Sequence, residues 1–507
     1  MARIAVIGAG MGAMAAAARL AVAGHRVAVF ERGATHGGAL QRFERDGFAF
    51  DTGPGLLHLP AVYRDLFVKT GREPLERCVE LTQVDPAVRH VFADGTAVSL
   101  PNASRAGVVE ALDTALGAGA GERWSAYINR ARESWDATRR PLLEEPLRPD
   151  WQVLGRDPYP AVRRRGLFGR GKGPTTATLA EVARRELADP RLVALLENHA
   201  SAYGFDPRSA PASAAVLPYM EETFGSWYVR GGMRVLADAL FARCTARKVE
   251  FAFGAEVTRI VEKDGRAAGV ELADGRVEEA DIVVAGVAPS LLEPMLRGGL
   301  PWGDDDVRPD ATAEVRAPGR FTLALALSGR RPQGAVHRTV VHTADRGAEL
   351  AAVFGEDVSR GVPCTDPTVT VLRPDDPGCR PDDDHEAVTL TATVAAPLRA
   401  ETAAEGPGWA ESFAERMTEI AEAAVPGLRE RLLWREVQPA DAEARVPGPA
   451  LAGAEGRFLR PANRTRVPGL YAVGGWSHPG GGLAHAGMSG AIVAGLIVNG
   501  DDWSGST

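Results

Sequence analysis

Residues 3–32 restrict the possible fold more than any other segment of the chain. An apolar strand, 4–7, runs into Gly8-Ala9-Gly10-Met11-Gly12-Ala13, and an alanine-rich helix follows as far as residue 23. After a turn at 24–25, a second apolar strand, 26–30, ends at Glu31. This succession of strand, glycine-rich turn, helix and acidic strand end predicts a βαβ unit that binds a dinucleotide.

The small residues of the turn each have a place in that interpretation. Gly8 permits the tight turn, Gly10 lets backbone N–H groups approach a pyrophosphate, and Ala13 allows helix and strand to pack closely. Glu31 is positioned to accept both hydroxyl groups of an adenosine ribose, which favours FAD or NAD over NADP. The alternative is a glycine-rich strand-to-helix turn in an α/β core that holds no ligand.

The chain beyond Glu31 favours FAD over NAD. A paired glycine segment, 37–38, is followed by a short strand around Phe48 and Phe50 and then by the loop Gly53-Pro54-Gly55. In one-domain NAD enzymes the second strand continues directly into the next crossover helix. A glycine-rich excursion at this point suits an extended flavin, because its ring must be covered.

The C-terminal segment is expected to contact the same nucleotide a second time. A turn and a buried strand, 470–473, lead into a glycine loop, 474–482, and a helix of small residues is expected from Leu483 to about Val498. The N-terminus of a helix offers unpaired N–H groups, which would stabilise the electron-rich edge of a reduced flavin. A glycine loop that merely ends a Rossmann sheet is the alternative.

Together these motifs resemble the phytoene desaturase branch of the FAD-dependent amine-oxidase superfamily, the bacterial carotenoid desaturase type. That family has VIGAG, then GG, GF-x-F-D-x-GP, a mid-chain YP-x-GG-x-x-x-L and a C-terminal NLY-x-VG-x-x-THPG-x-G. The chain matches them, in this order, at residues 6–10, 37–38, 47–54, 228–236 and 469–482. The resemblance implies a FAD-dependent oxidoreductase that desaturates a hydrophobic polyene or isoprenoid-like substrate by hydride transfer to the flavin.

The residues expected to bind FAD come from the motifs and from a segment that passes the adenine in related flavoproteins. They are Gly8, Gly10, Gly12, Ala13, Glu31, Arg32, Gly37, Gly38, Arg42, Gly53, Pro54, Val257, Gly474, Gly475, Gly481, Gly482 and Leu483.

Two departures from the family pattern affect the prediction. Ala39 stands where the family usually has Arg, so Gln41 or Arg42 is expected to help hold the cofactor instead. His485 stands in the first turn of the C-terminal helix, where an Ile-Pro-Gly type sequence is common. This histidine motivates a rival function, a tailoring enzyme of secondary metabolism that cyclises or reduces a polyene.

Two further rivals are less favoured by the sequence. An amine oxidase usually attaches its flavin to a cysteine near the C-terminus, and no cysteine follows Cys379. The same fold also serves as a non-enzymatic carrier of prenylated proteins, which the intact glycines at 8, 10, 37, 38 and 480–482 disfavour.

Composition indicates a cytoplasmic enzyme. The net charge of −8 disfavours nucleic-acid binding, and the four cysteines are scattered without a CxxC pair, so we expect no disulfide framework. We expect no signal peptide, no membrane-spanning segment and no metal site. The basic run Arg163–Lys172 is either a solvated loop or a peripheral contact with an anionic membrane surface.

The motifs predict an α/β protein in which a discontinuous Rossmann-like FAD-binding domain (1–100, 225–300 and 455–507) alternates with a substrate domain (101–224 and 301–454). The substrate domain should combine a helical cap with a mixed sheet. Helices are expected at 104–116, 121–137, 178–199 and 408–424, and strands at 320–328, 336–343, 367–372 and 387–395.

Three histidines are candidates for catalysis because flavin chemistry needs little more than a weak base. In a desaturation one hydrogen leaves as hydride and its neighbour as a proton, so a base or water suffices beside the flavin. His485 and His478 belong to the C-terminal motif, and His58 follows the loop 53–55. For each of them a purely structural, hydrogen-bonded role is the alternative. The sequence does not specify the substrate, the electron acceptor or the oligomeric state.

Overall fold

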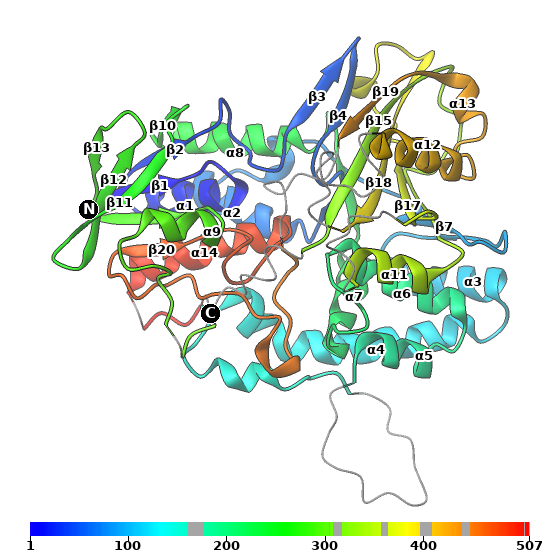
Figure 1. Cartoon of the computed structure of the whole chain (residues 1–507), viewed down its shortest axis with the longest axis horizontal. Helices are drawn as coiled ribbons and strands as arrows, with labels where there is room; N and C mark the ends of the chain where they lie inside the picture. Colours follow the sequence, from blue (N-terminus) through cyan, green and yellow to red (C-terminus); the bar gives the residue numbers. More distant parts are fainter. Residues whose placement is uncertain are drawn as a thin grey trace, which may run out of the picture.

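In the computed structural model, residues 1–160, 177–303, 305–307, 317–355, 364–395, 408–438, 447–500 and 502–505 are described. A five-stranded parallel sheet, ordered β10-β2-β1-β14-β20, brings three distant parts of the chain together (Figure 1). Its strands are β1 (Arg3–Ile7), β2 (Arg26–Glu31), β10 (Glu250–Phe253), β14 (Ile282–Ala285) and β20 (Leu470–Ala472). The predicted βαβ unit therefore forms the centre of this sheet.

The central strand β1 is apolar on both faces, as a parallel strand covered on two sides must be. Ile4 and Val6 pack towards the helices α1 (Met11–Val22), α2 (Ala61–Gly71), α8 (Arg234–Ala246) and α14 (Leu483–Asn499). Ala5 and Ile7 pack towards the meander β11 (Val257–Lys263), β12 (Arg266–Leu272) and β13 (Val277–Glu279).

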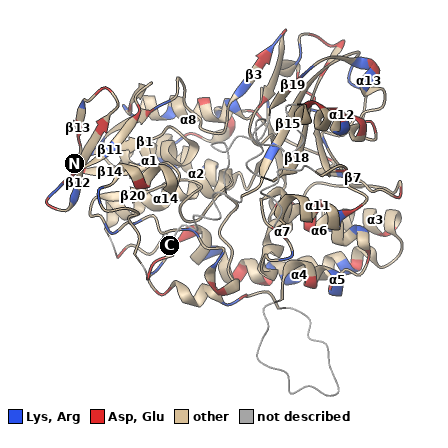
Figure 2. Cartoon of the chain, viewed as in Figure 1, with Lys and Arg blue, Asp and Glu red and all other residues tan. Residues whose placement is uncertain are grey.

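Helices α1 and α14 come from opposite ends of the chain and cross at very short range. A Cβ atom at Gly490 would lie 2.6 Å from the carbonyl oxygen of Gly12, and a Cβ atom at Gly12 would lie 2.9 Å from the carbonyl oxygen of Ala486. Helix α14 contains no charged residue (Figure 2). The two ends of the chain are therefore locked together by close backbone packing.

A seven-stranded sheet, ordered β19-β15-β18-β17-β16-β7-β8, forms the second layer system. Its strands are β7 (Val88–Val91), β8 (Ala97–Leu100), β15 (Gly319–Ser328), β16 (Arg338–Val341), β17 (Val369–Leu372), β18 (His385–Val394) and β19 (Leu432–Gln438). Helix α12 (Trp409–Ala421) covers one face, where Phe413 contacts Phe321 edge-on with ring centroids 5.0 Å apart. Strands β7 and β8 lie inside the range 1–100 and yet complete this second sheet. The domain boundaries stay a prediction.

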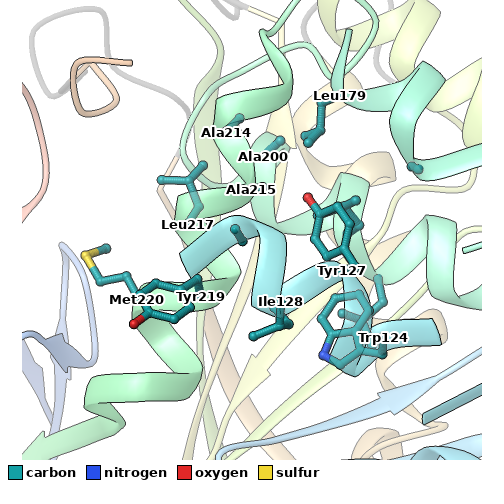
Figure 3. Close-up of a cluster of buried hydrophobic side chains, with 14 of the residues drawn as sticks. Trp124, Tyr127, Ile128, Leu179, Ala200, Ala214, Ala215, Leu217, Tyr219 and Met220 are labelled. Atoms are coloured by element: carbon teal, nitrogen blue, oxygen red, sulfur yellow. The ribbon is translucent and has the colours of Figure 1, made fainter. Parts of the chain in front are cut away.

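A helical cap packs beside this sheet around a buried aromatic core (Figure 3). Its helices are α3 (Arg105–Leu116), α4 (Ala120–Arg139), α5 (Leu179–Glu186), α6 (Pro190–Ala202) and α7 (Val216–Phe224). Trp124 and Tyr127 of α4 are almost fully buried, and Leu217 and Tyr219 of α7 belong to the same cluster.

The single helix expected over 178–199 is wrong, because the chain forms two helices there. Thr178 caps α5 in a capping box with Glu181. Ala188 then takes a left-handed conformation (φ 62°), and Asp189 is extended and caps α6, whose first residue is Pro190. A proline disfavours the helical conformation of the residue before it, so one helix ends here and a second helix begins at Pro190.

The remaining elements connect the two sheets. They are β3 (Arg42–Arg45), β4 (Phe48–Asp51), β5 (Leu57–His58), β6 (Leu81–Gln83), β9 (Ser226–Val229), α9 (Pro289–Leu292), α11 (Arg346–Phe354) and α13 (Leu428–Arg431). Strands β3 and β4 form a hairpin, and β9 lies between β5 and β6.

The predicted fold class is confirmed: an α/β protein with a Rossmann-like sheet, a mixed sheet and a helical cap. Among the described helices, none has the length and apolar character needed to cross a membrane. The described residues also contain no cluster of three or more His, Cys, Asp or Glu side chains suited to a metal ion. The basic run Arg163–Lys172 lies outside the described residues, so its role stays a prediction.

Candidate flavin site

The predicted phosphate-binding turn joins the end of β1 to the start of α1. Gly8 has φ 88°, a left-handed conformation that favours glycine, and its N–H donates to the carbonyl oxygen of Phe30 (2.8 Å). Gly10 precedes the first helical residue, no side chain caps α1, and its first turn has no acidic residue. The N–H groups that begin this helix are thus available to an anion such as a pyrophosphate.

Glu31 ends β2 next to this turn. Its Oε2 atom accepts a hydrogen bond from the N–H of Ala9, and its Oε1 atom accepts one from the N–H of Gly33, both at 2.7 Å. A carboxylate has about four lone-pair positions, so both oxygens can still accept ribose hydroxyl groups. Arg32 follows on the exposed side, and Val257 is buried at the start of β11, just after Ala255, whose N–H donates to the carbonyl oxygen of Glu31.

The paired glycines lie against the predicted phosphate-binding turn. The N–H of Gly37 donates to the carbonyl oxygen of Ala9 (2.9 Å), and a Cβ atom at Gly38 would lie 3.0 Å from the Cα of Gly10. A Cβ atom at Gly53 would lie 2.2 Å from the carbonyl oxygen of Ala39. The three glycine segments of the N-terminal motif therefore converge on one place, with Pro54 beside them.

Arg234, at the start of α8, holds the paired-glycine segment in position, a role the sequence did not suggest. Its guanidinium group donates to the carbonyl oxygen of His36 (2.9 Å), to Gln41 Oε1 (2.7 Å) and to Thr35 Oγ1 (2.9 Å), and it pairs with Asp238. The signal was present, because Arg234 lies inside the mid-chain motif at 228–236.

The guanidinium group of Arg42 is already engaged by other groups of the protein and is not free to bind a phosphate. Its guanidinium group donates to the carbonyl oxygens of Gly231 and Gly378, both at 2.9 Å, and its Nε atom lies 2.7 Å from Glu44 Oε1. Its contribution to FAD binding stays a prediction, although in this arrangement the group already ties the β3–β4 hairpin to two loops.

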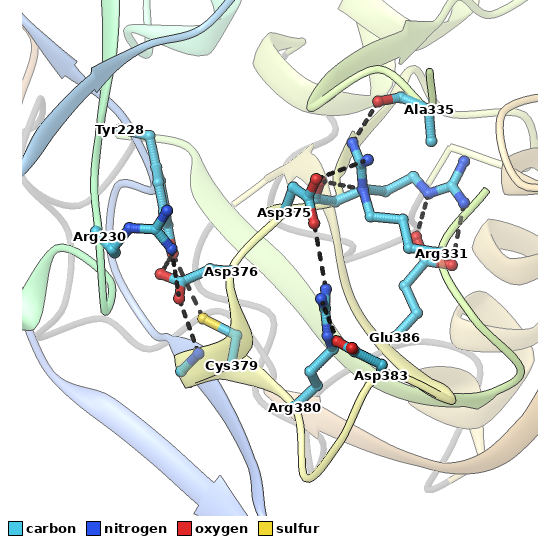
Figure 4. A network of polar contacts seen from close by, with 12 residues as sticks. Tyr228, Arg230, Arg331, Ala335, Asp375, Asp376, Cys379, Arg380, Asp383 and Glu386 are labelled. Atoms are coloured by element: carbon cyan, nitrogen blue, oxygen red, sulfur yellow. Dashed lines mark hydrogen bonds and ion pairs between the residues drawn. The ribbon is translucent and has the colours of Figure 1, made fainter. Parts of the chain in front are cut away.

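Two acidic residues bind the loop that begins α8. Asp51 accepts hydrogen bonds from the N–H groups of Met233 (2.9 Å) and Arg234 (3.3 Å), and burial raises the pKa of Asp51 to about 6. Asp376, between β17 and β18, accepts from the Tyr228 hydroxyl (2.9 Å) and from the N–H of Gly231 (2.5 Å) (Figure 4). The seven-stranded sheet is thus anchored to the loops around the glycine motifs.

The C-terminal glycine loop has its own buried support. Asn463 is almost fully buried, and its amide group donates to the carbonyl oxygens of Ala472 (3.1 Å) and His478 (2.7 Å) and to Ser489 Oγ (3.0 Å). The Ser489 hydroxyl accepts from the N–H of Gly474 (2.9 Å). This network fixes Gly474 and Gly475 between β20 and α14. Sequence analysis missed Asn463, because nothing near it resembles a motif.

Helix α14 begins beside this loop in the same way as α1. Gly482 precedes Leu483, the first helical residue, and Gly481 precedes Gly482. No side chain caps the helix, and its first turn contains no acidic residue. Its leading N–H groups have no capping side chain, and their stabilisation of a reduced flavin stays a prediction.

The three candidate histidines lie in different surroundings. His478 is fully buried and its Nε2 donates to the carbonyl oxygen of Glu145 (2.9 Å), so its Nδ1 remains an acceptor without a partner among the described residues. His485 lines a small, mostly apolar pocket between α4, α7 and α14. Burial lowers the pKa of each to about 4. His58 lies on β5, beside Ser226 and Glu221, and burial lowers its pKa as well.

These residues fit FAD. Two uncapped helix N-termini, an acceptor carboxylate at the end of β2 and glycines with no room for a Cβ atom provide acceptors for a ribose and donors for phosphate and flavin. The fold and this site define a flavin-dependent oxidoreductase.

Comparison with known proteins gives the family. The family model described as flavin containing amine oxidoreductase matches residues 14–309, more than half of the chain. The chain therefore belongs to the flavin containing amine oxidoreductase family, and its cofactor is FAD.

Curated relatives match over nearly the whole chain. The 4,4'-diapolycopene oxygenase of Methylomonas sp is 29% identical over 98% of this chain and 98% of its own. The hydroxyneurosporene desaturase of Cereibacter sphaeroides is 29% identical, covering 98% and 97%, and the zeta-carotene-forming phytoene desaturase of Myxococcus xanthus is 29% identical, covering 97% and 93%. Putrescine oxidase bound to putrescine shares the fold, with a TM-score of 0.63, 14% identity and coverage of 98% and 99%.

Proposed function

We propose that this protein desaturates a carotenoid-like polyene, with hydride passing from the substrate to FAD. The names of the curated relatives support this proposal, since each of the three acts on a carotenoid by name and matches over the full length of the chain. When bound, FAD supplies the hydride acceptor. The chain's own residues have to orient the substrate, exclude water and receive the second hydrogen as a proton.

The observation that carries the proposal is the cavity beside His485. Most of the residues that line it are apolar, among them Trp135, Leu142, Leu217 and Met220, and it extends from the first turn of α14 into the helical cap. Apolar lining with a few polar groups is typical of a site for a hydrophobic ligand. A polyene in contact with these apolar residues would lie at the end of α14 that also bears the C-terminal glycine loop.

His485 is suited to accept the proton. Its lowered pKa keeps the imidazole neutral above about pH 5, so a lone pair is available at neutral pH. A base with so low a pKa is weak, which suits a step in which departure of the hydride makes the neighbouring hydrogen acidic. Besides burial, the neighbouring His478 disfavours protonation of His485 and so lowers its pKa.

Anaerobic reduction of the bound flavin tests the proposal. Phytoene, which has saturated C–C bonds beside its conjugated double bonds, should bleach the visible flavin absorbance. Lycopene, in which those bonds are already double, should leave the absorbance unchanged. Putrescine serves as the amine control and should also leave it unchanged. Two results would contradict the proposed function. One is reduction of the flavin by putrescine. The other is no reduction by phytoene when dithionite reduces the flavin fully.

A further inference from the structure

The face of the seven-stranded sheet opposite α12 is lined with threonine. Because side chains alternate along a strand, Phe321 and Leu323 point to α12 and the residues between them point to the other face. In register on that face are Thr322 of β15, Thr391 of β18 and Thr370 of β17, with Thr389 and Thr393 on either side along β18. All five side chains are only half-buried, and none makes a hydrogen bond to another described residue.

This threonine face lies next to the loop Gly53-Pro54-Gly55. The neighbouring rows of the same face are covered by Phe48 and Phe50 of the β3–β4 hairpin, which pack on Ala324 and Ala326. Leu372, which is paired with Thr389, is close enough to the loop that a Cβ atom at Gly55 would lie 2.6 Å from its Cδ1. The β3–β4 hairpin therefore leaves the threonines uncovered on the side of the sheet that adjoins the loop Gly53-Pro54-Gly55.

A buried ionic cluster borders the threonine face. Arg338 of β16, paired with Leu372, lies 3.2 Å from Glu221 Oε2 of α7. The Tyr203 hydroxyl donates to Glu221 Oε1 (3.4 Å), and His199 and His58 lie 3.7 Å and 4.0 Å from the same carboxylate.

The histidines of this cluster are neutral and the carboxylate is charged. Burial lowers the pKa of His199 and of His58, so both are neutral at neutral pH. At acidic pH, where the histidines are protonated, His58, Arg338 and His199 together outweigh burial and lower the pKa of Glu221 to about 2. Glu221 and Arg338 therefore balance each other, and the histidines add no charge at neutral pH.

Arg320 adds a positive charge that the cluster does not balance. It lies on the threonine face next to Phe321, and its guanidinium group donates to the carbonyl oxygen of Ala202 (2.8 Å), beside Tyr203. Within the described part of the chain it has no carboxylate partner. Its side chain is exposed on this face, and the protein groups packed around it lower the pKa of Arg320. A partly desolvated guanidinium without a counter-ion is well suited to bind an anionic oxygen group.

We propose that the threonine face and Arg320 bind a carboxylate at one end of the substrate, which makes the substrate an acidic polyene rather than a pure hydrocarbon. This inference rests on the proposed function, since it assigns the substrate class of the same site. The threonine hydroxyls would donate hydrogen bonds to the carboxylate end of the substrate. The apolar residues beside His485 would contact its hydrocarbon part.

Binding of two retinoids to the FAD-loaded protein tests the proposal without any turnover. All-trans-retinoic acid and all-trans-retinol share one polyene and differ only in the end group, and equilibrium dialysis gives their dissociation constants. Retinoic acid should bind at least about ten-fold more tightly, the effect of one charge-assisted hydrogen bond. Arg320→Gln removes the charge but keeps a polar side chain, and it should remove this preference, while Arg320→Lys should retain part of it.

Arg435→Gln is the matched control. Arg435 lies on β19 of the same sheet, but it points to α12 and pairs with Glu411 and Glu415, so the preference for retinoic acid should persist. Equal affinities in the wild type, no saturable binding of retinoic acid, or a preference that survives in Arg320→Gln would each overturn the proposal. Because flavin reduction is not measured, these outcomes are separate from a failure of the proposed desaturation.

Discussion

Replacing Glu31 should separate its structural role from its role in binding FAD. Its carboxylate accepts two backbone hydrogen bonds at 2.7 Å, from Ala9 and Gly33, before any cofactor is considered. A hydrogen bond to a charged group contributes about 1.5–3 kcal/mol. Because Glu31 is half-exposed, the lower end of that range applies, and Glu31→Ala should lower the unfolding free energy of the apoprotein by about 2–3 kcal/mol.

FAD affinity should fall by an additional amount. Losing the ribose contact removes about 1.5–3 kcal/mol of binding free energy, a ten-fold to hundred-fold weaker affinity. Glu31→Gln should behave almost like Glu31→Ala, because an amide NH₂ group would face one of the backbone N–H donors. Urea denaturation of the apoprotein and titration with FAD measure the two effects. Glu250→Gln, on the neighbouring strand and exposed, is the control. An unchanged FAD affinity in Glu31→Ala would refute the assignment of the ribose to this carboxylate.

The remaining predictions concern the histidines, the helix crossing and the β3 arginine. The pKa of His478 and of His485 is about 4, against about 6.5 in the unfolded chain, which therefore binds more protons between these values. The unfolding free energy should thus rise by up to about 3 kcal/mol per histidine from about pH 4 to about pH 6.5, and urea titrations of His485→Ala should show a smaller rise. His485→Ala should slow flavin reduction by phytoene on the order of 10²-fold with FAD retained, and near-normal reduction would rule out its role as the base. Gly490→Ala should cost about 1–3 kcal/mol, because its methyl group would overlap α1, and an unchanged melting temperature would contradict the close crossing. If Arg42 leaves the carbonyl oxygens of Gly231 and Gly378 and reaches the phosphates of FAD, Arg42→Ala should weaken FAD binding in a salt-sensitive way and Arg45→Ala should not, so equal retention in both would show that this segment supplies no cation to the cofactor.

Local patterns predicted the βαβ unit well because every signal there agrees. The apolar runs, the glycine turn and the acidic strand end all lie within about 30 consecutive residues, so no distant contact is needed to read them. The helix expected over 178–199 shows the opposite case. Its apolar periodicity continues across Asp189 and Pro190, but the helical backbone is interrupted there. The proline therefore outweighs the periodic pattern.

Contacts between distant loops were beyond reach of the sequence. Asp376 receives the N–H of Gly231, and Asn463 supports the loop at Gly474 through Ser489, yet neither residue stands in a recognisable pattern. The partners of β7 and β8 were hidden for a related reason, because alternation identifies a strand but not the sheet that it joins.

Assembly of the five-stranded sheet from both ends of the chain has a consequence for biosynthesis. A ribosome releases β1, β2 and α1 first and β20 and α14 last, so for most of translation the glycine-marked side of α1 and the free edge of β14 have no partner. A nascent chain that still lacks β20 and α14 can form only the N-terminal part of the predicted FAD site. Until β20 and α14 are added, the unpaired strand edge and the apolar side of α1 are surfaces prone to aggregation.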